Sequence, residues 1–137
     1  MKIKVIASDE VASYPGLTEA ILAMYGRLDL PKHWWFIAIE KGEWMGYGGL
    51  REINSESVYS GPTFVKEEFR GKGLQRKLIR ARLRKAKADG YLESISCVYA
   101  ENHFSGNNLI AEGYRMTTIP LYYENSEPNE VWFKRKI

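Results

Sequence analysis

The segment from residue 58 to residue 99 constrains the fold of this chain most, because it runs from a strand through a glycine-containing loop and a helix into a second strand. The stretches "VYSGPTFV" at 58–65 and "YLESISCVY" at 91–99 are rich in β-branched and aromatic residues, which is typical of strands. Between them, "GLQRKLIRARLRKAKADG" has apolar residues at helical spacing and ends at Gly90, a glycine placed to terminate a helix. We therefore expect two parallel strands joined by a right-handed crossover.

The rest of the chain surrounds this crossover with antiparallel pairs. Hydrophobic periodicity predicts a strand at 2–8, a helical stretch at 13–30 closed by Pro31, a hairpin of strands 34–40 and 44–53 turning at Lys41-Gly42, a short helix at 105–113, and strands at 114–123 and 130–137. Gly61-Pro62 interrupts the strand 58–65, so a bulge or a local splay is expected there. The order predicts an α/β fold: a mixed, mostly antiparallel central sheet of about seven strands, with helices on both faces and one parallel β-α-β crossover.

Size and composition limit the classes of protein to consider. At 137 residues the chain is expected to form a single domain over residues 1–137. It has no apolar run of ~20 residues and no secretory pattern at its start, so no membrane span is expected. The single cysteine, Cys97, has apolar neighbours, which suggests a buried thiol in a reducing compartment and hence a cytoplasmic protein.

The positive charge of the chain is concentrated in one place. Residues 70–87 hold nine of the 20 Lys and Arg residues and no acidic one, whereas the remainder has 11 basic against 17 acidic residues. With Leu74, Leu78, Ile79, Leu83 and Ala86 on the buried face, the charges of this helix are expected to face solvent. Such a local positive field favours an anionic ligand or partner at one place over a uniformly basic surface that binds nucleic acid.

The loop before this helix is suited to holding a phosphate group. Gly71 and Gly73 permit positive φ, and a strand–loop–helix junction directs the first N–H groups of the helix at one point. The loop matches neither the Walker pattern nor the Gly-x-Gly-x-x-Gly pattern of dinucleotide-binding proteins. Taken alone, it is also compatible with an ordinary turn surrounded by solvated charges.

Two motifs identify a family that this chain resembles. "FVKEEFRGKGLQRKLI" resembles the coenzyme A motif of the GNAT acetyltransferases, Arg/Gln-x-x-Gly-x-Gly/Ala after a strand ending in Val, with Arg70 and Gly73 in the first two slots. "ENHFSGNNLIAEGYR" resembles the second motif of that family, in which Asn102 precedes a helix that ends at Gly113-Tyr114. The expected order of strands and helices agrees with the GNAT fold along nearly the whole chain.

This resemblance implies that the chain binds acetyl-CoA. It assigns backbone contacts to the pantetheine arm to Phe64 and Val65, and it places the Val65 N–H where it can stabilise an oxyanion. Asn102 is expected to hydrogen-bond the pantetheine, with Ser105 and Asn108 beside it. The pyrophosphate is expected to lie among the following residues of the loop and first helical turn: Arg70, Gly71, Lys72, Gly73, Leu74, Gln75 and Arg76.

Two positions depart from the pattern of the family. Gln75 stands where Gly or Ala is usual, so its side chain must either point away from the pyrophosphate or contact it directly. Leu109 occupies the slot in which many members of the family have a tyrosine that donates a proton to the leaving thiolate. Either a water or another group (Ser105, His103 or Tyr99) takes that role, or the thiolate leaves unassisted, since a thiol pKa near ~8.5 makes it a tolerable leaving group.

The general base is the least determined part of the site. An amine acceptor titrates near ~10.4 and must lose a proton before it can attack. Glu52, near the end of the strand that precedes 58–65, is the first candidate, and His103 is the second. For both residues a purely structural role, as a solvated turn charge or a polar residue at the start of a helix, remains the alternative.

The functional expectation is an N-acetyltransferase that transfers an acetyl group from acetyl-CoA to a primary amine of a protein, peptide or small molecule by direct attack in a ternary complex. No metal is expected, and a homodimer is left open. One alternative is a catalytically weak regulator that binds acyl-CoA. The other is a nucleic-acid-binding module that uses the basic helix 74–89, which is disfavoured because the chain has no helix-turn-helix, RNP or zinc pattern.

Overall fold

The computed structural model describes residues 1–28, 30–120 and 127–137. The elements are, in chain order, β1 (Lys2–Ala7), the 3₁₀ helix η1 (Ser8–Ser13), α1 (Leu17–Tyr25), β2 (His33–Glu40), β3 (Glu43–Glu52), β4 (Ser57–Val65), the 3₁₀ helix η2 (Glu67–Phe69), α2 (Leu74–Ala88), β5 (Glu93–Tyr99), α3 (His103–Ala111), β6 (Arg115–Thr117) and β7 (Glu130–Lys136). Within the described residues, no helix has the length and apolarity needed to cross a membrane.

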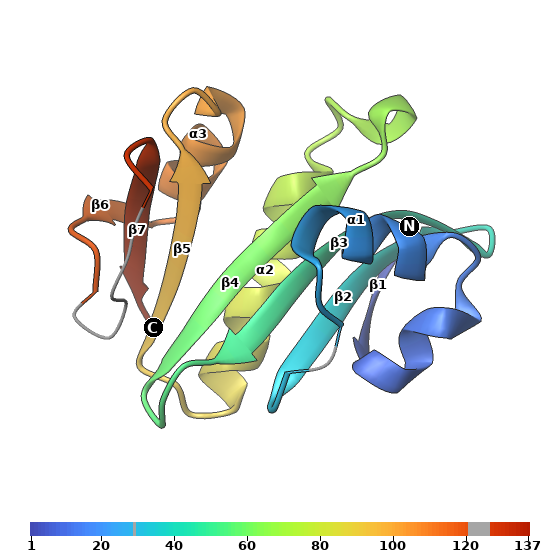
Figure 1. Cartoon of the computed structure of the whole chain (residues 1–137), viewed down its shortest axis with the longest axis horizontal. Coiled ribbons are helices and arrows are strands. Elements are labelled where there is room, and N and C mark those ends of the chain that lie inside the picture. Colours follow the sequence, from blue (N-terminus) through green and yellow to red (C-terminus); the bar gives the residue numbers. More distant parts are fainter. Residues whose placement is uncertain (29, 121–126) are drawn as a thin grey trace.

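The strands form one seven-stranded sheet in the order β1-β2-β3-β4-β5-β7-β6. β4 and β5 are parallel, and the other neighbouring strands are antiparallel. α1 lies in front of the sheet and α2 behind it (Figure 1). The fold class predicted from the sequence, including the single parallel crossover, is confirmed.

The strands of the hairpin are buried on both faces, because one core lies on each side of the sheet. Along β2, Trp35 and Ile37 pack with Leu17 and Ile21 on the α1 side. The alternate residues Phe36 and Ala38 pack against the α2 side with Leu74 and Leu78, among others. This period of two places successive side chains in different cores and explains why β2 reads as a nearly continuous apolar run.

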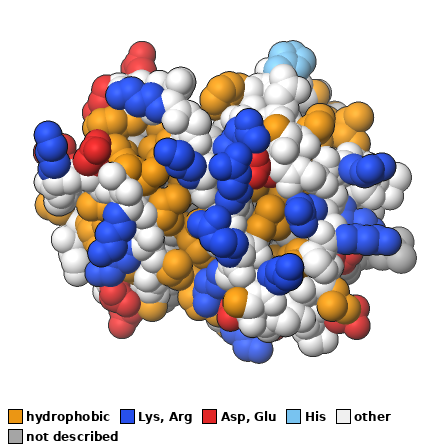
Figure 2. All heavy atoms as spheres, turned by 180° about the vertical axis from the view of Figure 1, so that it is seen from behind, with side chains coloured by type: hydrophobic (Ala, Val, Ile, Leu, Met, Phe, Trp, Pro, Cys, Tyr) orange, Lys and Arg blue, Asp and Glu red, His pale blue; other side chains and the backbone are white. Residues whose placement is uncertain are grey.

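The helix α2 follows the sequence prediction with one exception. It ends at Ala88, and Gly90 has a φ of 88°, so the predicted glycine terminator is confirmed. Lys77, Arg80, Arg84 and Lys87 are exposed, and Figure 2 shows the Lys and Arg side chains on this rear face. Arg82, however, was expected to face solvent and is instead buried, with 2% of its surface exposed.

Two of the predicted elements needed correction. Of the helical stretch expected at 13–30, only Leu17–Tyr25 is an α-helix, and it ends at Tyr25 because Gly26 adopts a left-handed φ of 78°. Pro31 therefore does not terminate the helix. The 3₁₀ helix η1 precedes it and shares only Ser13 with that stretch. The strand expected at 114–123 is described only as β6, and residues 121–123 of that prediction lie outside the described residues.

The strand β4 has the irregularity that Gly61-Pro62 predicts. The Gly61-Pro62 peptide bond is cis. The register between β3 and β4 shifts from the pair Gly48–Thr63 to the pair Leu50–Ser60, so two residues of β4 lie opposite one residue of β3. The predicted bulge is confirmed, and β4 bends away from β5 just beyond it.

Candidate active site

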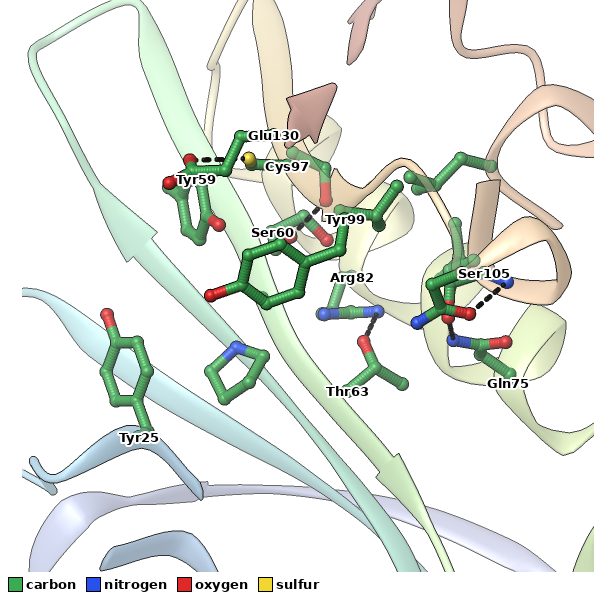
Figure 3. A pocket seen from close by; sticks show the side chains of 17 residues that line it. Tyr25, Tyr59, Ser60, Thr63, Gln75, Arg82, Cys97, Tyr99, Ser105 and Glu130 are labelled. Carbon is green, nitrogen blue, oxygen red and sulfur yellow. Dashed lines mark hydrogen bonds between the residues drawn. The ribbon is translucent and has the colours of Figure 1, made fainter. Parts of the chain in front are cut away.

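A cavity opens where β4 and β5 separate. The two strands pair only between Ser57–Tyr59 and Glu93–Ile95. At the end of that pairing, the Ser96 hydroxyl donates to the Ser60 carbonyl at 2.7 Å. Beyond this point the strands diverge around a cavity of about 350 Å³ (Figure 3). The side chains that line it come from α1, β4, α2, β5, α3 and β7.

The outer half of β4 directs backbone N–H groups toward this opening. Lys66 N donates to Met45 O at 2.9 Å, so these two residues form a hydrogen-bonded pair. Paired residues in an antiparallel ladder alternate between hydrogen-bonded and non-hydrogen-bonded pairs. The register therefore turns the N–H groups of Thr63 and Val65 away from β3. The carbonyl of Val65 also points to that side, where it accepts a hydrogen bond from Arg70 Nε at 2.9 Å.

Phe64 faces the other way from these backbone groups. Its ring packs against Trp44 and Tyr47 on the α1 side of the sheet, with ring centroids 6.4 Å and 5.7 Å away respectively. Tyr47–Phe64 is the next hydrogen-bonded pair along this ladder, so the backbone N–H and carbonyl of Phe64 also point to β3. The backbone groups that face the opening are those of Thr63 and Val65, on either side of Phe64.

The glycine loop has the backbone geometry expected of a phosphate-binding turn. Gly71 and Gly73 adopt left-handed φ values of 79° and 76°. Gly73 is the N-cap of α2, and no side chain caps the helix. The N–H groups of Leu74, Gln75 and Arg76 therefore open the first turn without a side-chain acceptor, where the helix dipole favours an anion.

The cations predicted around the loop have different surroundings. Arg70 turns back to the Val65 carbonyl. Arg76 forms an ion pair with Glu112 at 2.8 Å, which ties α2 to α3. Lys72 is exposed, with its ammonium 5.9 Å from the centre of the Phe69 ring. The side chain of Arg76 is thus directed to α3, and its contribution to the loop is its backbone.

Gln75, the departure from the family pattern, extends its side chain toward α3. Its amide nitrogen donates to Ser105 Oγ at 2.9 Å, and its amide oxygen accepts from Asn108 Nδ2 at 2.6 Å. Asn102 caps α3 by accepting from Ser105 N at 3.2 Å. The structure thus brings these four predicted residues into one network. Three of them, Gln75, Asn102 and Ser105, line the cavity.

Neither predicted base lies in this cavity. Glu52 accepts a hydrogen bond from the Tyr91 hydroxyl at 2.8 Å and forms an ion pair with Lys32 at 3.2 Å. The hydrogen bond from Tyr91 is the main reason why the pKa of Glu52 is lowered. Glu52 lines a neighbouring hollow that shares Tyr25 with the cavity. His103 is exposed at the start of α3 and does not line the cavity.

The sequence reasoning missed a group of residues at the end of the cavity opposite the glycine loop. Glu130, from the start of β7, lies opposite Tyr99 in the sheet and accepts a hydrogen bond from the Cys97 thiol at 3.0 Å. Tyr25 and Tyr59 line the same end of the cavity (Figure 3). The long-range pairing of β5 with β7 brings these residues together, so no local motif in the sequence predicts the group.

Cys97 differs from the sequence expectation of a packed thiol. It is half-buried and lines the cavity. Burial and the hydrogen bond to Glu130 raise the pKa of the Cys97 thiol, so it stays protonated and acts as a donor to the carboxylate. Leu109, in the slot where the resemblance suggested a tyrosine, is buried in the cavity wall.

Comparison with known proteins identifies the class. A model of the acetyltransferase (GNAT) family matches residues 5–108, and the chain therefore belongs to this family. A search among curated proteins finds no match.

Several solved structures share the fold. An IAA acetyltransferase from Bacillus cereus superposes with a TM-score of 0.75 at 18% identity, with 99% of each chain covered. A GNAT family acetyltransferase from Elizabethkingia anophelis with acetyl-CoA bound has a TM-score of 0.70 at 18% identity, with 98% of each chain covered. A Bacillus subtilis acetyltransferase in complex with CoA has a TM-score of 0.72 at 18% identity, covering 99% of this chain and 98% of the other.

Proposed function

We propose that this acetyltransferase moves the acetyl group of acetyl-CoA to a primary amine by direct attack in a ternary complex. The observation that carries the proposal is the cavity between β4 and β5, which extends from Gln75, in the helical turn that follows the glycine loop, to Glu130. One end thus has backbone donors for a phosphate, and the other has a group that can accept a proton. A transferase with two substrates needs both ends in one continuous space.

The cofactor end consists mainly of backbone. In this proposal the N–H groups from Gly71 to Gln75 hold the pyrophosphate, and the outward-facing backbone of β4 pairs with the pantetheine arm as an added strand. Asn102 and Ser105 lie across the cavity from β4 and supply further polar contacts. The N–H groups of Thr63 and Val65 polarise the thioester carbonyl and stabilise the oxyanion that forms when the amine attacks.

At the acceptor end we assign the role of base to Glu130. An alkyl ammonium group near pKa ~10.4 must lose a proton before attack, and a carboxylate acting directly or through one water can accept it. Tyr25 and Tyr59 line this end of the cavity, where the Arg51 guanidinium lies 4.9 Å from the centre of the Tyr59 ring and donates to the Tyr25 hydroxyl at 3.2 Å. Tyr99, which also lines the cavity and whose hydroxyl donates to Glu127 at 3.2 Å, is our candidate for donating a proton to the leaving thiolate.

Binding of acetyl-CoA tests the proposal first. At a concentration about 100 times Kd, the ligand should add ~2.7 kcal/mol to the free energy of unfolding and raise the melting temperature by several degrees. A mass-spectrometric screen of amines with labelled acetyl-CoA would then identify acceptors. The absence of any thermal shift at millimolar acetyl-CoA would refute the proposal.

Leu109 supports a second candidate function, a regulator that binds acyl-CoA. Without a tyrosine at that position, the chain could bind acyl-CoA and act as a regulator with weak turnover. This function predicts the same thermal shift but no acetylated product with any amine class. Turnover of even one amine at a rate well above the non-enzymatic rate would exclude it.

A further inference from the structure

Arg82 is an unusual residue for the interior of this protein. It is a cation with only 2% of its surface exposed, and within the described part of the chain no carboxylate lies within ion-pairing distance of it. Its guanidinium donates to Leu78 O at 3.2 Å, Gly49 O at 3.1 Å and Thr63 Oγ1 at 2.7 Å. Burying an unpaired charge is costly, so a role beyond filling space is expected of these contacts.

The contact with Gly49 replaces a hydrogen bond that β4 cannot make. The bulge places Gly61 and Pro62 opposite Gly49 in β3. Counting along the ladder from the hydrogen-bonded pair Met45–Lys66, the next hydrogen-bonded positions are Tyr47–Phe64 and then Gly49–Pro62. Pro62 has no N–H, so it cannot donate the hydrogen bond that the Gly49 carbonyl would accept at that position of the ladder. The guanidinium of Arg82 donates to that carbonyl instead.

The contact with Thr63 extends the same support to the next residue of β4. Thr63 is one of the two residues whose N–H groups point toward the cavity, and its side chain is held by Arg82 (Figure 3). Gly48 makes room for the guanidinium, because a Cβ there would lie 3.0 Å from Arg82 Cζ. Arg82 therefore spans both strands of the bulge at the point where β4 turns away from β5.

We propose that Arg82 is a positioning residue for acetyl transfer: it replaces the missing donor of Pro62 and holds the Thr63–Val65 segment with its N–H groups directed into the cavity. The role rests on the proposed function, since these N–H groups are those assigned to the thioester oxygen. Arg82 acts through the backbone of β3 and β4. Loss of its hydrogen bonds should therefore reduce the rate of the chemical step more than the affinity for acetyl-CoA.

The experiment uses one variant of Arg82 and one matched pair at Thr63. Arg82→Met keeps an unbranched side chain as far as the position of Nε and removes the donors. Thr63→Val removes the acceptor of one of these hydrogen bonds while leaving Arg82 in place, and Thr63→Ser retains it. We expect Arg82→Met and Thr63→Val to lower kcat by about ten- to a hundredfold, the effect of misplacing an oxyanion donor, with less than about a threefold change in the Kd of acetyl-CoA. Thr63→Ser keeps the hydroxyl that accepts from Arg82, so it should lose less kcat than Thr63→Val.

A second-site change tests the replacement of the donor directly. Pro62→Ala restores a backbone N–H opposite Gly49, so it should recover part of the kcat that Arg82→Met loses. Amide hydrogen exchange in the ligand-free protein gives a readout that does not depend on turnover. Exchange of the Phe64 and Lys66 amides, which bond across to β3, should be faster in Arg82→Met and slower again in the double variant.

The outcomes separate this inference from the proposed function. If the unaltered protein does not acetylate any amine, the proposed function fails, while hydrogen exchange still decides whether Arg82 orders the bulge. If Thr63→Val and Thr63→Ser behave alike in both kcat and exchange, the inference is overturned. The same holds if Arg82→Met lowers acetyl-CoA affinity as much as kcat and Pro62→Ala restores neither. Should Arg82→Met fail to fold, the Thr63 pair alone decides.

Discussion

Two carboxylates, Glu52 and Glu130, are candidates for the role of base. Tyr25 lines both the cavity that contains Glu130 and the neighbouring hollow that contains Glu52. Glu130 lines the cavity itself, whereas Glu52 lines the neighbouring hollow and is engaged by Tyr91 and Lys32. The lowered pKa of Glu52 also makes it a weaker base. The two residues can be separated by isosteric amide substitutions.

We predict that Glu130→Gln lowers kcat by about a hundredfold or more with little change in the Kd of acetyl-CoA, since general-base catalysis contributes ~10²–10⁴-fold. Glu52→Gln should change kcat by less than about threefold. Steady-state kinetics at saturating acetyl-CoA would check both values. The reverse pattern would return the role of base to Glu52, and equal small effects would exclude both carboxylates.

The second prediction at the scale of a single residue concerns His33. This histidine is buried against Trp35, with ring centroids 4.5 Å apart, and neither ring nitrogen has a hydrogen-bond partner among the described residues. Burial, with the nearby charge of Arg51, lowers the pKa of His33 from 6.5 to about 4. Below about pH 6.5 the unfolded chain therefore binds a proton that the folded protein resists.

The stability contributed by a neutral His33 should be fully present above about pH 6.5 and decline as the pH falls toward about 4. Denaturant unfolding at pH 7 and pH 5 would measure this loss. In His33→Phe the loss between these two values should be smaller, while exposed His103→Gln, the matched control, should keep it. Equal losses in all three proteins would show that His33 is not responsible.

At the scale of elements, the contact between α2 and α3 depends on one buried acid. The Glu112 side chain is 8% exposed and pairs with Arg76 at 2.8 Å and Arg80 at 2.6 Å. Desolvation opposes its charge, but the hydrogen bonds from these two arginines outweigh it and lower the pKa of Glu112. Since Gln75 and Ser105 meet across the same pair of helices, this contact also sets one wall of the cavity.

Glu112→Gln should reduce the free energy of unfolding by about 1–2 kcal/mol, between the values typical of exposed pairs and fully buried ones. Denaturant unfolding measures it. The exposed pair of Lys85 and Asp89 on the same helix provides the control, because Asp89→Asn should cost no more than about 0.5 kcal/mol. Equal effects of the two substitutions would contradict the assigned difference in burial.

The glycine loop, the β4 bulge and the ends of α2 are the parts of the site that the sequence could predict. The glycine loop, the bulge at Gly61-Pro62 and the end of α2 at Gly90 follow from local rules of backbone geometry and were correctly predicted. The sequence also required the side chain of Gln75 to point away from the loop or contact its ligand, and the structure directs it to α3. Local patterns were sufficient for these features because the physical cause of each lies within a few residues.

Arg82 and Glu130 could not be predicted in the same way. Arg82 lies among other cations on an amphipathic helix, and its burial depends on Gly48 and Gly49 in a distant strand. Glu130 starts the last strand, and only the register of β5 with β7 brings it to Cys97. Both depend on contacts between residues more than 30 positions apart, which a periodicity in the sequence does not encode.

At the scale of the whole molecule, the order of the elements was sufficient to predict the sheet. One helical crossover with antiparallel pairs on both sides leaves few arrangements that keep connections short and right-handed. The resulting sheet has an antiparallel set, β1 to β4, joined to a second one, β5, β7 and β6. The hydrogen-bonded pairing between the two sets involves only Ser57–Tyr59 and Glu93–Ile95.

This short pairing has a consequence for the stability of the two sets. Proteins open locally along contiguous units, and a pairing of three residues is a natural boundary for such opening. We predict that, without ligand, amides of β5 and β7 exchange with solvent faster than those of β2 and β3. Saturating acetyl-CoA should slow β5 and β7 the most, as measured by hydrogen exchange with mass spectrometry. Uniform slowing across the sheet would indicate that the two sets open together.

A ligand that lies between β4 and β5 contacts both sets at once. It would occupy the position that a further strand would fill in a continuous sheet, and the proposed recognition would use the backbone groups of β4 that remain unpaired where the pairing with β5 ends. The acetyl donor would then be a structural link between the two sets of strands as well as a reactant. Each turnover would form this link when acetyl-CoA binds and lose it when CoA leaves.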